Sequence, residues 1–290
     1  MTQVNITYLL LVITWYVLFV IFFLFLYLKY KKPYYVSNIQ KIYKKIPENL
    51  SPLELSMLLH RKVTHGALSA TIVYLIEQGY IIREGDILKK VPGELGLSLS
   101  QNSALEILFD VLGNGKMVDV SEIENFCDNN SSATDFLLSY DIWNNMSIRE
   151  VTASKQFFVQ KMDYELVKWF QYLGYFLVLL NVVLHCHYFA GYLIIFPAYF
   201  LLQYFYRISK RTKQYQKQFY QWLGFGNYLT TLNSKDELEL NQTWVLVYSI
   251  LLNKVEHVEK IIKEEQFYTN LDKAIQKCHC QAVFLGNRKI

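Results

Sequence analysis

Two long apolar segments organise the pattern of hydrophobic and polar positions along the chain. The first covers residues 6–28 and contains no Asp, Glu, Lys or Arg. A helix rises about 1.5 Å per residue, so this segment is long enough to cross a bilayer core roughly 30 Å thick. Lysines follow it at once, and positive charge gathers on the cytoplasmic side of a span. We therefore predict a membrane anchor at residues 1–30 with its N-terminus outside, followed by a basic linker at residues 31–46.

A cleaved signal peptide is the alternative interpretation of this first segment. Such a peptide needs basic residues in front, a shorter apolar stretch and a small-residue cleavage site. None of these features appears in residues 1–30, so a retained anchor is favoured.

The second apolar segment covers residues 169–206, and as one helix it would be close to twice the thickness of the bilayer core. Two spans of about 18 residues with a tight turn fit it better. The turn is predicted at residues 185–191, a stretch without Lys or Arg, whereas basic residues lie on both flanks. Both flanks, and with them the C-terminus, should be cytoplasmic. A buried hairpin of a soluble domain is the alternative, which this length and flanking charge disfavour.

Residues 47–150, between the two apolar segments, have the pattern of a folded module. Ser51-Pro52-Leu53-Glu54 has capping-box spacing with proline at the first helical position, which predicts a helix start. A second helix is predicted from Thr64 to Gly79, because apolar residues recur there at helical spacing and glycine ends helices. Two β-prone runs around Glu84-Gly85-Asp86 then indicate a hairpin. Helix, turn, helix and hairpin is the order of a winged-helix domain.

Helices are expected over the rest of the chain. Amphipathic patterns and capping residues predict further helices in the module, and a connecting helix at residues 151–168 leads toward the second apolar segment. The tail at residues 207–290 also has helical periodicity. The predicted fold class is mainly α: three transmembrane helices, one N-terminal and then a helical hairpin, with a cytoplasmic winged-helix-like α+β module and a helical C-terminal tail.

The start of the tail combines cations with aromatic residues. Residues 207–213 are basic, and Phe219, Trp222 and Phe225 follow at helical spacing. One interpretation places this helix along the anionic inner leaflet, with its cations outward and these three rings in the lipid interface. The alternative is a plain helix extension whose lysines only follow the topology. Residues 244–265 form a second amphipathic pattern, which should pack on the module or on a partner.

The winged-helix order raises the question of nucleic-acid binding. A helix-turn-helix reader presents polar and basic residues of its second helix to the major groove. Here the outward positions of that helix are Ser69, Thr71, Tyr74, Glu77 and Gln78, without Lys or Arg. Phosphate attraction dominates nucleic-acid affinity, and the formal net charge of the chain is only +4. Nucleic-acid binding is therefore disfavoured, and a structural or protein-contact role is favoured.

Candidate chemistry is sparse in this sequence. His185-Cys186-His187 and Cys278-His279-Cys280 carry zinc-ligating side chains, but adjacent positions rarely project toward one ion, and the predicted topology separates the two clusters by the membrane. Four cysteines in 290 residues do not indicate a disulfide scaffold. No P-loop, dinucleotide-binding glycine pattern, HExxH or GxSxG element is present. We therefore expect no catalytic, cofactor-binding or metal site, and no enzyme.

Several motifs of the module and the tail match one known family. Its Pro-x-x-Leu-Ser-Pro-x-Glu segment is matched by Pro47, Leu50, Ser51, Pro52 and Glu54. Its Leu-x-Ala-Thr-x-x-x-Leu-x-x-x-Gly-Tyr pattern is matched by Leu68, Ala70, Thr71, Leu75, Gly79 and Tyr80. Residues 222–229 are similar to a later aromatic segment of the family. Its Leu-Pro-Tyr-Ala-x-x-Leu-Gly signature is reduced here to Tyr248 and to Leu251 or Leu252.

On these residues the chain resembles the DUF2207 family of predicted bacterial membrane proteins, over roughly residues 45–263. The resemblance implies a membrane protein with a cytoplasmic module, and the family offers no catalytic residues to transfer. Family members carry a secretion signal and an extracellular β-rich domain before the first span. Only residues 1–5 precede the apolar segment here, so we expect this chain to lack that domain.

Together these patterns predict a multipass plasma-membrane protein with its N-terminus outside and its C-terminus in the cytoplasm. Its predicted role is that of a scaffold or regulator that presents the module to a protein partner, and a second copy of the chain is one candidate partner. A membrane-tethered transcription regulator is one alternative, and a small-molecule transport or immunity-type membrane protein is another. The apolar segments hold no charged side chain, which leaves a single copy without an obvious ion path.

Overall fold

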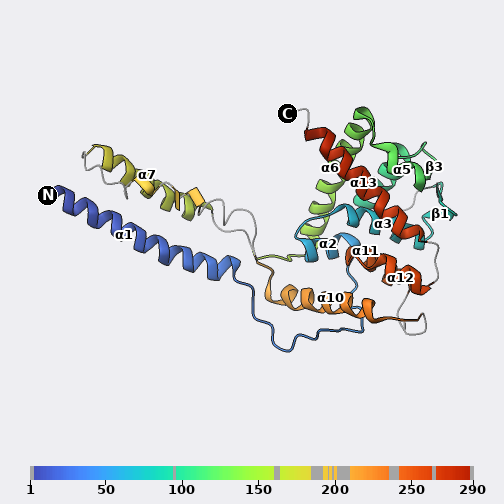
Figure 1. Ribbon diagram of the computed structural model, residues 1–290, viewed down its shortest axis with the longest axis horizontal. Coiled ribbons are helices and arrows are strands. Elements are labelled where there is room, and N and C mark those ends of the chain that lie inside the picture. The colour runs from blue at the N-terminus through green and yellow to red at the C-terminus, as the bar shows by residue number, and fades with distance from the viewer. Residues whose placement is uncertain are drawn as a thin grey trace. The chain divides into compact units, whose positions relative to one another are not determined.

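Two compact units make up the protein. The computed structural model describes residues 3–93, 96–159, 164–183, 192–194, 196–197, 199–200, 210–234, 242–262 and 266–287. Unit 1 combines Met1–Tyr35 with Phe158–Gln216, and unit 2 combines Val36–Phe157 with Lys217–Ile290. Both units are built mainly from helices, which confirms the mainly α fold class (Figure 1).

Unit 1 is centred on α1 (Gln3–Leu26), which continues into the π-helical turn η1 (Tyr27–Lys31). The stretch Ile6–Lys31 has a mean hydropathy of 2.9, and only 17% of its apolar window is buried inside the protein. A core helix of a soluble domain would bury most of this surface. Within the described part of the chain it is the one helix long and apolar enough to cross a membrane, as predicted for the anchor.

A second helix, α7 (Tyr164–Val183), lies beside α1 (Figure 1). The Tyr8 hydroxyl donates a hydrogen bond to the Leu177 carbonyl at 3.0 Å. A Cβ at Gly174 would lie 3.2 Å from the Trp15 ring, so the small residue lets the indole approach the helix backbone. Two helices in lipid associate through such small-residue contacts, since apolar burial alone gives no driving force there.

The predicted hairpin at residues 169–206 is only partly described. Its expected turn, residues 185–191, lies outside the described residues, as do residues 201–209. The three-span arrangement therefore stays a prediction.

The continuous connecting helix expected at residues 151–168 is not what the structure contains. Helix α6 (Asn130–Ser154) ends before Lys155, whose backbone is extended. The Lys155 ammonium reaches the carboxylates of Glu48 at 3.3 Å and Glu54 at 3.5 Å. These contacts, which lie far along the chain and are invisible to local periodicity, take the chain out of the helix.

Unit 2 begins with the predicted order of helix, helix and hairpin. Its elements are α2 (Pro52–His60), α3 (His65–Glu77), β1 (Ile81–Glu84), β2 (Ile87–Lys90), α4 (Leu99–Leu105) with the π-helical η2 (Glu106–Val111), β3 (Met117–Asp119), α5 (Val120–Phe126), α6, α10 (Lys213–Thr231), α11 (Gln242–Leu251), α12 (Val255–Ile262) and α13 (Phe267–Asn287). The three strands form an antiparallel sheet of order β1-β2-β3. Strand β3, which was not predicted, pairs Val118 with Leu88 of the hairpin.

The capping box at the start of α2 is formed as predicted. The Ser51 hydroxyl accepts the Glu54 amide at 3.2 Å, and the Glu54 carboxylate accepts the Ser51 amide at 2.9 Å. At the end of α3, Gly79 has a φ of +78°, a left-handed conformation that side chains with a Cβ rarely adopt.

We expect Ser51→Ala to destabilise unit 2 by about 1 kcal/mol, because the first turn of α2 loses its side-chain acceptor. Thermal unfolding of the full chain in detergent measures this change. Ser132→Ala is the control, since that hydroxyl lies in the first turn of α6 and its amide, which the variant keeps, makes the capping contact to Asn129. Equal effects of the two substitutions would contradict a stabilising role for the capping box.

Candidate functional site

Helix α3 is the centre of unit 2 and is enclosed by other helices. It packs against α2, α4, α11 and α13 (Figure 1). Ser69 and Thr71 are fully buried, so the prediction that they point outward is wrong. Tyr74 contacts the Trp244 ring of α11 at 5.3 Å between centroids, and Glu77 accepts a hydrogen bond from the Tyr268 hydroxyl of α13 at 2.6 Å. The tail helices thus cover the face that a groove-reading helix would need.

Helix α13 is held at both ends of its contact with the module. At its start, the buried Glu259 carboxylate accepts the amides of Tyr268 at 2.6 Å and Thr269 at 3.1 Å, and Arg83 lies over the Phe267 ring at 4.0 Å. Further along, the Lys277 ammonium lies 2.8 Å from a Glu124 carboxylate oxygen of α5. Sequence reasoning missed Glu259, although a glutamate among the apolar positions of an amphipathic helix was an available signal.

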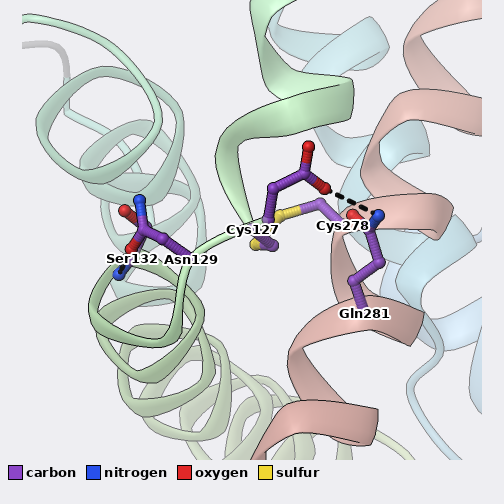
Figure 2. The surroundings of a disulfide bond; sticks show 6 residues. Cys127, Asn129, Ser132, Cys278 and Gln281 are labelled. Atoms are coloured by element: carbon purple, nitrogen blue, oxygen red, sulfur yellow. Dashed lines mark hydrogen bonds between the residues drawn. A yellow bond between two sulfur atoms is a disulfide. The ribbon is translucent and has the colours of Figure 1, made fainter.

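A disulfide bond joins α13 to the end of α5. Cys127 and Cys278 are both fully buried, with their Cα atoms 5.2 Å apart (Figure 2). Beside the bond, the Gln281 side-chain amide donates to the Asp128 carboxylate at 2.9 Å (Figure 2). The sequence pattern argued against a disulfide scaffold and did not predict this single bond. The separation of the two cysteines by 151 residues explains why spacing along the chain did not reveal it.

Helix α10 turns its large aromatic residues into the domain. Trp222 and Phe225 are fully buried, and the Trp222 ring packs edge-on against Tyr248 of α11 with centroids 4.7 Å apart. The interpretation that these two rings lie in the lipid interface is wrong, because α11 supplies the apolar surface that they need. The cations Lys213 and Lys217 of the same helix are exposed.

A segment without regular secondary structure, residues 36–43, contacts α10, and we call it the strap. The Tyr43 amide donates to the Gly224 carbonyl at 3.0 Å, and the Asn227 side chain donates to the Lys41 carbonyl at 2.9 Å. A Cβ at Gly224 would lie 2.9 Å from the Gln40 carbonyl oxygen, so glycine permits this close approach. A cavity of about 370 Å³ lies between the strap and α10.

A family model of predicted membrane proteins matches residues 39–260, from the strap to α12. The chain belongs to the DUF2207 family. The matched part is the C-terminal domain of that family, and α13 lies beyond it. Comparisons with curated proteins and with solved structures find no match.

The structure separates the side chains of Cys278-His279-Cys280, the cluster of zinc-ligating residue types that was considered and disfavoured in the DUF2207 protein. Cys278 is committed to the disulfide, Cys280 is exposed, and His279 packs against the Tyr140 ring at 4.5 Å. The described residues contain no group of three or more His, Cys, Asp or Glu that could hold an ion. The other cluster, at residues 185–187, lies outside the described residues.

Two histidines of the DUF2207 protein meet where α13 crosses the start of α3. The rings of His65 and His279 have centroids 5.8 Å apart. Burial lowers the pKa of both rings, and Lys62 lowers both further, while Asp272 opposes the shift at His65 and Asp141 opposes it at His279. Burial also raises the pKa of Asp272, against a hydrogen bond from Ser69. The site therefore favours neutral histidines and disfavours their protonation.

We expect the unit 2 fold to lose stability as the pH falls below 6.5, the ordinary histidine pKa. The unfolded chain binds protons there that the folded site resists, so the stability of the neutral pair is complete above pH 6.5 and is lost toward the lowered pKa values. A shift of one pKa unit corresponds to about 1.4 kcal/mol, and the effect per ring should be smaller because both rings are partly solvated. Asp272 acts in the opposite direction, between its raised pKa and 3.8.

Thermal unfolding of the full chain at pH 7.5 and 5.5 measures this loss. His279→Gln is expected to reduce the difference between the two pH values, because one of the two titrating rings is gone. His257→Gln is the control, since that ring contacts the Leu232 carbonyl outside the pair. An unchanged pH difference in His279→Gln would contradict the role of the pair.

Proposed function

We propose that this DUF2207 protein is a multipass plasma-membrane protein that presents a winged-helix-like domain to protein partners at the cytoplasmic face. The observation that carries the proposal is the direct succession of the apolar helix α1, a run of lysines and the family domain. A tethered domain has a raised local concentration near other membrane proteins, which suits a scaffold or a regulator.

The assembly of unit 2 from two separate stretches of the chain supports the predicted transmembrane hairpin. Val36–Phe157 and Lys217–Ile290 form one compact unit, so both stretches must lie on the same side of the membrane. The segment between them can then cross only an even number of times. Helix α7 within this segment exposes many apolar side chains, as a lipid-facing helix does: Trp169, Tyr172, Leu173, Tyr175, Phe176, Leu179, Val182 and Val183. Two crossings account for both features.

Enclosure of α3 favours a protein-contact role over a transcription regulator. A reading helix must enter the major groove, and α3 has its Ser69 and Thr71 buried under neighbouring helices. Transport has little support as well, since neither apolar segment contains an Asp, Glu, Lys or Arg. The proposal assigns no catalysis to the chain.

Helix α6 offers a surface for a protein partner. Leu138, Ile142 and Met146 recur every four residues and are 63%, 46% and 38% exposed. Side chains four apart lie on one face of a helix, so the three form a continuous apolar stripe. Exposed apolar stripes of this kind are frequent at protein contacts. A second copy of the chain and a different membrane protein are both candidates for the partner.

A photo-reactive residue in place of Ile142 is expected to crosslink the full chain to one defined partner in cells. An additional substitution in the same chain, Leu138→Asp, should lower the crosslinking yield at least fivefold because it interrupts the stripe. Leu99 of α4, which is 75% exposed, is the matched control site. Equal capture from positions 99 and 142 would contradict a specific contact surface on α6.

Native cysteines can test the topology. Cys280 is exposed on α13, and the predicted topology puts it in the cytoplasm and Cys186 outside. A membrane-impermeant maleimide should therefore label the wild-type chain and Cys280→Ser in intact cells, but not Cys186→Ser. Permeabilising the cells should make Cys186→Ser reactive. Labelling of Cys186→Ser in intact cells would place the domain outside and overturn the proposal.

The disulfide provides a second test of the same topology. Disulfide bonds are rare in the cytoplasm, where thiols are kept reduced. A cytoplasmic domain should therefore hold Cys127 and Cys278 in cells as adjacent thiols that form the bond only on oxidation. Acid quenching, denaturation and alkylation before mass spectrometry count these thiols. A pair found fully oxidised after quenching would argue for an oxidising compartment.

A further inference from the structure

The cavity between the strap and α10 has the chemistry of an anion site. Its lining has one charged side chain, Lys217, and no carboxylate, together with uncharged polar and apolar residues: Val36, Ser37, Asn38, Ile39, Gln40, Tyr43, Tyr220 and Gln221. Hydroxyl and amide groups can donate hydrogen bonds to phosphate oxygens. The apolar Val36 and Ile39 add a surface suited to a glycerol or acyl carbon chain.

In the part of the chain that the structure describes, the lysines of the segments that line this cavity form no ion pairs. Lys41, Lys44 and Lys45 of the basic linker are exposed, as are Lys213 and Lys217 of α10. None of these five lysines forms a salt bridge within the described residues. Glu48, which follows the linker at the start of the module, contacts Lys155 and the Gln218 side chain instead. Among the described residues, the segments that line the cavity therefore carry an excess of positive charge.

The chain connects this cavity closely to the membrane anchor. Val36 follows Lys31, the end of the apolar helix, by five residues. An extended chain covers at most about 3.6 Å per residue, so the strap begins within roughly 18 Å of that end. A bilayer of about 40–45 Å has a headgroup layer outside its core of roughly 30 Å, and the strap is within reach of this layer.

We propose that the cavity binds the phosphate of an anionic phospholipid headgroup, with Lys217 as the charged contact. This inference rests on the proposed function, because it needs the DUF2207 domain at the membrane surface. Lipid binding would give the strap a role, because the bound headgroup would hold the domain at the surface of the inner leaflet. Lysines that merely follow the topology would attract anionic lipid diffusely and equally at all five positions.

Variants within α10 separate a defined site from diffuse attraction. Lys217→Gln removes the cation that lines the cavity. Lys213→Gln removes another exposed lysine, one helical turn away, that does not line the cavity. Gly224→Ala leaves the charge unchanged and places a Cβ 2.9 Å from the Gln40 carbonyl oxygen, which should displace the strap. Lys273→Gln on α13 is a control for a remote exposed lysine.

Native mass spectrometry of the full chain in neutral detergent, titrated with dioctanoyl phosphatidylglycerol, measures the binding. We expect one retained lipid per chain, no retained dioctanoyl phosphatidylcholine, and at least fivefold weaker binding for Lys217→Gln and Gly224→Ala. Lys213→Gln and Lys273→Gln should change binding less than twofold. Equal losses in Lys213→Gln and Lys217→Gln would overturn the site in favour of diffuse attraction.

Competition with a soluble ligand identifies the source of the phosphate. Glycerol 3-phosphate that displaces the lipid at equal concentration would overturn the assignment to lipid and leave a soluble phosphate ester as the ligand. Membrane fractionation of Lys217→Gln keeps the two proposals distinct, because insertion depends on α1 and not on this cavity. A variant that still fractionates with membranes but shows unaltered lipid binding would overturn the cavity site alone.

Discussion

The burial of α3 is the constraint on which the rest of unit 2 depends. This helix carries a nearly continuous set of buried side chains, and α2 alone is too short to cover them. Helices α11 and α13, which follow the second apolar segment in the chain, complete the cover. The domain therefore cannot form from one side of that segment only. Its two stretches, residues 36–157 and 217–290, must meet before α3 is fully covered.

Local signals in the sequence predicted the local structure well. The capping box at Ser51, the glycine at the end of α3 and the hairpin around Gly85 all follow from residue preferences within a few positions. Predicting a membrane span from the charge-free segment of α1 likewise requires only the length and composition of that segment. These features depend on residues that are close together along the chain, so the sequence pattern alone is enough to predict them.

Long-range packing set the limits of sequence reasoning. Ser69 and Thr71 look like surface residues on a helix considered alone, and their burial depends on the elements that pack around α3. Trp222 and Phe225 need an apolar environment, which lipid or protein could supply, and the structure provides it through the protein. The pairing of Cys127 with Cys278 and the meeting of His65 with His279 also depend on where α13 docks.

Assembly of the domain across an intervening apolar segment has a consequence for synthesis. Residues 36–157 leave the ribosome long before α11 and α13 exist, so α3 is initially without its cover. The apolar surface of α3 is exposed in this partly synthesised chain, which is prone to aggregation until α11 and α13 pack against it. The domain therefore reaches its final packing only after the second apolar segment and the tail have been synthesised.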